Sequence, residues 1–108
     1  MKPIDVIWAA VDNGAMGAVS ALETNNIKGT IVVSSGCSGT EPLNMINDPD
    51  AYYKCGIGAP YSARDIVKLV MQSLQDYFSG KEVEKQQYVE FFPIDSTNIA
   101  DYKELLDK

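Results

Sequence analysis

The chain has 108 residues, of which 45% are hydrophobic and 22% charged, and its formal net charge is −6. This length suits a single domain with a modest core. A single arginine and the acidic balance argue against nucleic-acid binding and against adhesion to anionic membranes. Histidine is absent, which argues against zinc sites and Ser-His or Cys-His nucleophiles, so we expect no catalytic residue, metal or cofactor.

The start of the chain gives an expectation about its compartment. No apolar run approaches the roughly 20 residues that a membrane-spanning helix needs. The first ten residues, MKPIDVIWAA, are interrupted by Pro3 and Asp5, so they cannot form the apolar core of a signal peptide. Because a strand follows directly, the pattern favours a piece of a longer, exported precursor over a cytosolic protein.

The first predicted element is a short apolar run, Ile4–Trp8, typical of a strand with both faces covered. It leads through Val11, Asp12 and Asn13 into a helix over about 13–25, and Asp12 is placed to cap that helix. Such a turn leaves unpaired N–H groups at the carboxyl edge of a sheet, where open α/β sheets bind small ligands. These three turn residues are therefore candidate ligand contacts. For Asp12, a helix cap without any ligand is an equally good interpretation.

Three more strand-like and three more helix-like segments follow. The longest helix has the clearest pattern, because its apolar residues recur at steps of three and four, which predicts one stripe packed on a sheet. The alternating order predicts an α/β fold with an open, largely parallel sheet. The predicted strands are Thr30–Ser34, Tyr52–Gly58 and Tyr88–Ile94, and the predicted helices are 42–46, Ser62–Phe78 and one that begins after Ser96 or Thr97.

A run of small and polar residues, Ser34–Thr40, follows the second strand. Such a loop can bring backbone N–H groups close to a ligand, so Ser35, Cys37 and Ser38 are candidate contacts. Cys37 lacks the histidine or arginine that a nucleophile loop needs. Tyr61, at the carboxyl end of the third strand, could stack on a ligand ring, although a surface tyrosine is an equally good interpretation.

The order of the motifs carries a further signal. The segments IDVIWAAVDNGAMGAVSAL, IKGTIVVSSG and YVEFFPIDSTNIADY occur in the order of a strand–Asn-Asp–helix segment, a second strand and a closing strand. In this they resemble the carboxyl-terminal portion of the type I periplasmic sugar-binding proteins, over essentially the whole chain. The resemblance implies a periplasmic-binding-protein-like fold of two flavodoxin-like lobes with a small solute between them.

That resemblance implies a function and a domain organisation. The chain would be the solute-binding component, or a fragment of it, of a bacterial ABC-type uptake system for a sugar or related small molecule, and not an enzyme. Its parent protein would be extracytoplasmic and would meet a membrane permease. Residues 1 to about 60 would belong to one lobe and about 61–108 would return to the other, and a lone fragment would self-associate. The alternative is the effector-binding domain of a lactose-repressor-type regulator, which shares the lobe fold.

The chain departs from the family pattern at two places. Val11 stands where the family has a ligand-contacting asparagine, and no acid stands in Gly36–Ser38, where the family has an aspartate. Because buried sugar hydroxyls need hydrogen-bond partners, these losses favour either a less polar ligand than a sugar or no ligand bound by this fragment alone. Whether Cys37 and Cys55 form a disulfide is left open by their spacing.

Overall fold

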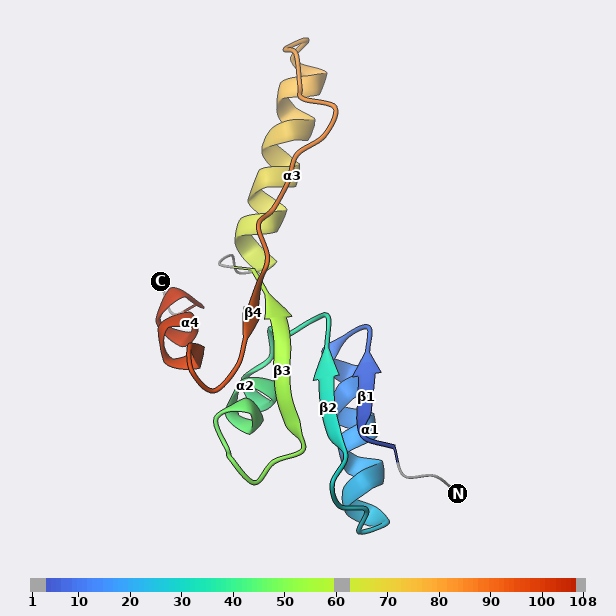
Figure 1. Ribbon diagram of the computed structural model, residues 1–108. Coiled ribbons are helices and arrows are strands. Elements are labelled where there is room, and N and C mark those ends of the chain that lie inside the picture. Colours follow the sequence, from blue (N-terminus) through green and yellow to red (C-terminus); the bar gives the residue numbers. More distant parts are fainter. Residues whose placement is uncertain (1–3, 60–62, 107–108) are drawn as a thin grey trace.

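The computed structural model describes residues 4–59 and 63–106 (Figure 1). Within them the α/β class is confirmed, and most elements end within two residues of their predicted bounds. In chain order the elements are β1 (Val6–Ala9), α1 (Asp12–Thr24), β2 (Ile31–Ser34), α2 (Thr40–Ile46), β3 (Tyr53–Gly58), α3 (Ala63–Phe78), β4 (Phe92–Ile94) and α4 (Ile99–Leu106).

The strands form one open sheet in the order β1-β2-β3-β4. The β1–β2 and β2–β3 pairs are parallel, as predicted, but β4 runs antiparallel to β3, so the prediction of a parallel arrangement is wrong for the last strand. Figure 1 shows the reason: α3 does not cross the sheet but runs away from it, and residues 82–91 return alongside the helix. The chain therefore re-enters the sheet from the opposite end.

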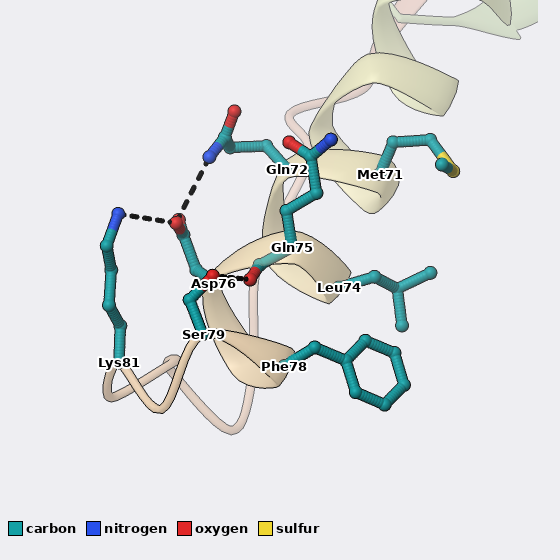
Figure 2. Close-up of a pocket in the computed structure, with 8 residues that line it drawn as sticks. All are labelled: Met71, Gln72, Leu74, Gln75, Asp76, Phe78, Ser79 and Lys81. Atoms are coloured by element: carbon teal, nitrogen blue, oxygen red, sulfur yellow. Dashed lines mark hydrogen bonds and ion pairs between the residues drawn. The ribbon is translucent and has the colours of Figure 1, made fainter.

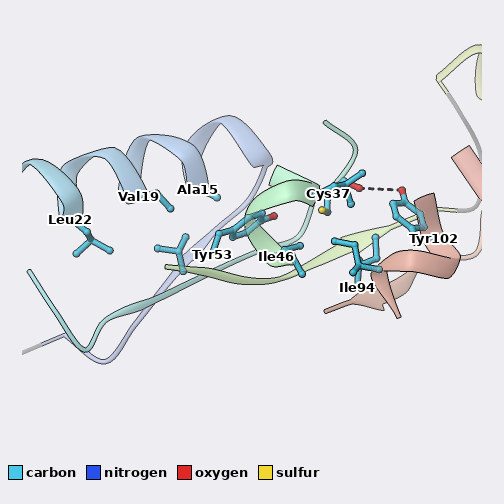
Figure 3. Close-up of a cluster of buried hydrophobic side chains, with 11 residues drawn as sticks. Ala15, Val19, Leu22, Cys37, Ile46, Tyr53, Ile94 and Tyr102 are labelled. Atoms are coloured by element: carbon cyan, nitrogen blue, oxygen red, sulfur yellow. Dashed lines mark hydrogen bonds between the residues drawn. The ribbon is translucent and has the colours of Figure 1, made fainter. Parts of the chain in front are cut away.

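The core lies between the sheet and the helices on one of its faces. Ala15, Val19 and Leu22 of α1 point toward the strands (Figure 3), and Tyr53 of β3 is fully buried beneath them. The last two elements, β4 and α4, extend the same core through Ile94, Ile99 and Tyr102. Residues 4–59 and 92–106 thus form one body, and residues 63–91 leave it and return to it.

The other face of the sheet is open. Trp8 is 65% exposed and Val6 is 51% exposed on β1, and Ile31 and Ile57 are also exposed on the neighbouring strands. The prediction that both faces of the first strand are covered is therefore wrong for the residues that the structure describes. Parallel sheets are normally covered on both faces, so this apolar face is a surface without its usual covering layer.

Residues 63–91, here called the arm, project from the body (Figure 1). The apolar stripe of α3 was expected to pack on the sheet, and this prediction is wrong: Val67, Leu74 and Phe78 are 59%, 45% and 81% exposed. The molecule is accordingly elongated, with extents of 59 × 30 × 18 Å. Across the described ranges, every helix is too short or too polar to cross a bilayer.

Candidate functional site

The carboxyl ends of β1 and β2 are joined by one carboxylate. Asp12 is the first residue of α1, but it does not cap that helix: the N-cap is Val11, and no side-chain cap bond is present there. Instead, Asp12 Oδ2 accepts hydrogen bonds from the backbone N–H groups of Ser38 (2.9 Å) and Gly39 (3.3 Å), and from the Ser38 hydroxyl (3.3 Å). The capping role predicted for Asp12 is therefore wrong, and its side chain fixes the loop after β2.

A second contact joins the same two strand ends. The indole Nε1–H of Trp8 donates to Ser35 Oγ at 3.0 Å, and the backbone N–H of Ser35 donates to the carbonyl of Ala9 at 3.0 Å. The hydroxyl of Ser35 is thereby oriented by an exposed aromatic ring. The beginning of the loop is fixed to β1 by this pair of bonds.

The underside of the loop is anchored in the core. The hydroxyls of Ser34 and Tyr53 lie 2.5 Å apart, and both contact the carbonyl of Gly36. On the other side, the Tyr102 hydroxyl lies within hydrogen-bond distance of the carbonyls of Cys37 (3.1 Å) and Ala59 (3.2 Å), as Figure 3 shows for Cys37. Residues 34–39 are therefore a fixed surface with anchors on four different elements.

This loop forms one wall of a cleft of about 230 Å³. The other walls come from the carboxyl end of β3, the first turn of α3, and the segment that re-enters the sheet. The cleft thus lies where the arm leaves and rejoins the body, at the carboxyl edge of the parallel strands, which is where open α/β sheets bind ligands. Its lining residues are Ser35, Gly36, Cys37, Ser38, Ile57, Gly58, Ala59, Ile66, Phe91 and Tyr102.

The predicted site residues divide into three groups. Ser35, Cys37 and Ser38 line the cleft together. Val11, Asp12 and Asn13 are not among the lining residues; Asp12 supports the loop from behind, and Val11 and Asn13 are exposed. Tyr61 lies outside the described residues.

The other seven lining residues were not predicted as site residues, and three of them are bulky side chains that come from outside the strand ends and the loop. Ile66 and Tyr102 were assigned to apolar helix stripes, and Phe91 was assigned to a strand core or rim. Phe91 is 63% exposed at the cleft and is the most accessible aromatic ring there. Local patterns identify such residues as apolar, but they do not show that the arm brings Ile66 and Phe91, and α4 brings Tyr102, to the loop after β2.

Larger hollows lie along the arm. One of about 600 Å³ lies at the far end of α3, between Met71 and Lys81 (Figure 2). Two others, of about 480 and 440 Å³, lie between α3 and the returning segment around Val89. These hollows are lined only by α3 and the segment that follows it, whereas the cleft is lined by the end of β3, the loop after β2, α3 and α4.

The described side chains that line the cleft are uncharged, and its thiol and its tyrosine hydroxyl are both protonated at neutral pH. Burial raises the pKa of the Cys37 thiol to about 11, so the thiol is protonated and a poor nucleophile at neutral pH. Burial likewise raises the pKa of Tyr102. Among the described lining residues no side chain carries a charge, and no group of acids and cysteines in the described ranges could hold a metal.

The two cysteines are free thiols. A Cβ added to Gly56 would collide with Cys37, which places Cys37 on the helix-covered face of β3. Cys55 precedes Gly56 and pairs with Val33, so strand alternation directs it to the open face. The disulfide left open by the sequence is absent because the two side chains lie on opposite faces of the sheet.

No model of a known protein family matches the chain, and no curated protein matches it. Among solved structures, the chain is similar to an ABC transporter solute binding protein from Agrobacterium vitis, determined with bound allitol. The TM-score is 0.81 at 21% sequence identity, over 95% of this chain. The likeness establishes the fold, which is that of a periplasmic-binding-protein-like α/β unit. The chain spans 34% of the length of that protein.

Proposed function

We propose that this chain is the solute-binding component, or part of it, of an ABC-type uptake system for a sugar or related small molecule. The observation that carries the proposal is the cleft at the carboxyl ends of β2 and β3, built on a fold that a solute-binding protein shares. The similar protein belongs to an uptake system rather than to a regulator, which supports transport over effector sensing. A binding role also agrees with the protonated Cys37 thiol, so we propose no enzymatic activity.

The lining of the cleft suggests the chemistry of the solute. The hydroxyls of Ser35 and Ser38 and the backbone of their loop supply hydrogen-bonding groups. Ile57 and Phe91 supply an apolar surface. With no charged lining residue in the described part of the chain, the favoured ligand is a neutral hydroxylated molecule with one apolar face, such as a sugar or a linear polyol.

The position of the cleft suggests a two-lobed protein. The arm leaves the body directly after β3 and returns directly before β4, and the cleft lies at that junction. We propose that the body is one lobe and that the arm belongs to the second. Closure of the two lobes would then enclose the solute, and the closed form would be recognised by a membrane permease. The parent protein would accordingly work outside the cytoplasm.

Ligand-dependent thermal stability tests the proposal. The 108-residue chain is unfolded by heating, with circular dichroism as the signal, in the presence of pentoses, hexoses, hexitols including allitol, and less polar neutral diols. A solute at ten times its Kd stabilises by about 1.4 kcal/mol, which raises the Tm of a domain near this size by roughly 5–10 °C. If no neutral solute in the panel raises the Tm, the proposed function is wrong.

A matched pair of variants tests the location of the site. Phe91→Ala removes an exposed ring at the cleft, and the solute affinity is expected to fall about 10- to 100-fold. Tyr88→Ala removes a ring that is 84% exposed on the same returning segment but does not line the cleft, so it should leave the affinity unchanged. Equal losses in both variants, or in neither, would place the solute elsewhere.

A further inference from the structure

The backbone donors of the loop after β2 are already bonded within the chain. Of the five residues 35–39, four donate their backbone N–H to an acceptor on another residue. These bonds run from Ser35 to the Ala9 carbonyl (3.0 Å), from Gly36 to Ser34 Oγ (3.3 Å), and from Ser38 and Gly39 to Asp12 Oδ2 (2.9 and 3.3 Å). Because each N–H carries a single proton, the loop offers a solute its side chains and carbonyl oxygens rather than a cradle of N–H donors.

The hydroxyl of Ser35 keeps its proton for a solute. The indole Nε1 of Trp8 can only donate, so Ser35 Oγ is the acceptor in the 3.0 Å bond between them. Within the described residues, no acceptor receives the proton of Ser35. Since the Ser35 side chain is exposed and lines the cleft, it can donate a hydrogen bond to a molecule bound there.

The hydroxyl of Ser38 has the opposite polarity. A carboxylate can only accept, so Ser38 donates its one hydroxyl proton to Asp12 Oδ2 at 3.3 Å. The backbone N–H of Ser38 donates to the same oxygen at 2.9 Å, which fixes the backbone and the side chain against one acceptor. The Ser38 oxygen therefore meets a solute only with its lone pairs.

The other polar groups that line the cleft add no accessible donor. The Tyr102 hydroxyl has one proton, and the carbonyls of Cys37 and Ala59 both lie within its hydrogen-bond distance. Cys37 is 2% exposed, so its backbone N–H and its weakly donating thiol are covered. The described lining contains no lysine or arginine. Within that lining, Ser35 is thus the one accessible side-chain donor.

We propose that Trp8 and Asp12 are positioning residues that fix these two polarities, so that the cleft selects a hydroxylated neutral solute over the carboxylate of the same skeleton. The inference rests on the proposed function. A solute hydroxyl can accept from Ser35 and donate to Ser38, whereas a carboxylate can only accept. A bound carboxylate would have one accessible donor and would face the lone pairs of Ser38, and a charge that leaves water without partners loses affinity.

Paired solutes test this selectivity. Each hexitol that raises the Tm is compared with the aldonate of the same skeleton, beginning with glucitol and gluconate, which differ only in a terminal CH2OH against a carboxylate. Isothermal titration calorimetry of the 108-residue chain is expected to give a Kd at least about tenfold lower for the hexitol. Equal affinities, or a preference for the aldonate, overturn the inference and leave the solute-binding function standing.

Two serine variants separate the two polarities. Ser38→Ala removes an acceptor that only the hexitol can use, so the preference for the hexitol should shrink to less than about threefold. Ser35→Ala removes the donor that both solutes use, so both affinities should fall and the preference should remain. Asp12→Ala frees the Ser38 proton and should also reduce the preference, whereas a loss of structure would weaken both solutes alike. A preference that survives in Ser38→Ala, or disappears in Ser35→Ala, overturns the assignment.

Hydrogen exchange measured by NMR tests the same polarities without a solute. The indole N–H of Trp8 should exchange slowly although the residue is 65% exposed, and Ser35→Ala should accelerate it. Asp12→Ala should accelerate exchange of the Ser38 amide and leave that of the Ser35 amide unchanged. Fast exchange of the indole or of the Ser38 amide in the unmodified chain overturns the inference. If no neutral solute binds, the proposed function fails, and these exchange rates decide the inference on their own.

Discussion

The Asp12 carboxylate accepts the backbone N–H of Ser38 at 2.9 Å and thereby joins the start of α1 to the loop after β2. These residues are far apart in the sequence, and the loop they hold forms one wall of the cleft. The shape of the cleft therefore depends on a side chain that does not line it. Substitution at Asp12 should therefore alter the conformation of the loop directly, and the affinity for a ligand only through that loop.

We expect Asp12→Ala to lower the free energy of unfolding by about 1–2 kcal/mol, because two backbone donors and the Ser38 hydroxyl lose their acceptor. Asp12→Asn retains one amide oxygen that can accept and should recover part of the loss. Urea unfolding followed by circular dichroism measures both effects. The control is Asp5→Ala, an exposed site expected to change stability by less than about 0.5 kcal/mol.

Tyr102→Phe should destabilise the chain by about 1–3 kcal/mol, because the carbonyls of Cys37 and Ala59 lose a buried donor. The ring contact with Phe92, at 5.4 Å between centroids, is retained, so the change reports on the hydroxyl alone. Thermal unfolding by calorimetry provides the measurement. An equal loss in Tyr88→Phe, where the hydroxyl is exposed and bonded only to Gln86, would contradict this assignment.

Gly58→Ala should be destabilising by about 1–3 kcal/mol, because an added Cβ would lie 2.7 Å from the Tyr102 hydroxyl oxygen and would also collide with Ile94. Gly17→Ala is the opposite case: no atom lies within 4 Å of an added Cβ in the middle of α1. It should stabilise the chain by roughly 0.5–1 kcal/mol through helix propensity. The midpoints of urea unfolding should therefore move in opposite directions.

Stability should fall in alkaline solution. Burial raises the pKa of Cys37 from 9.0 to about 11 in the folded chain. Because the folded pKa is the higher one, the stabilising contribution is complete below pH 9 and is lost as the pH rises through 11. Burial raises the pKa of Tyr102 as well, which acts in the same direction at higher pH. Urea midpoints between pH 8 and 11 should decline less steeply in Cys37→Ala than in the unmodified chain; identical slopes would contradict the role of the thiol.

Local patterns predict the elements well because their causes are local. The β-branched run in β2 and the apolar steps in α3 are both found where the sequence placed them. The same patterns do not reveal what each apolar surface packs against. The α3 stripe was expected to contact the sheet, but the chain turns away after β3, so the stripe is exposed and β4 becomes antiparallel.

The site was predicted only in part for a similar reason. The loop containing Ser35, Cys37 and Ser38 could be identified from its small residues and its place after a strand. The role of Asp12 could not, because a carboxylate at a helix start can equally cap its own helix or bond to a distant loop. Phe91 comes to the cleft only because the arm returns there, which no local pattern encodes.

The hydrogen bond between Trp8 and Ser35 makes the candidate site visible to spectroscopy. The chain has one tryptophan, so its entire indole fluorescence arises beside the loop that borders the cleft. Any solute or substitution that moves Ser35 will alter the polarity around that ring and shift its emission. The molecule thus carries its own optical reporter, at the one place where binding is expected, and needs no attached dye.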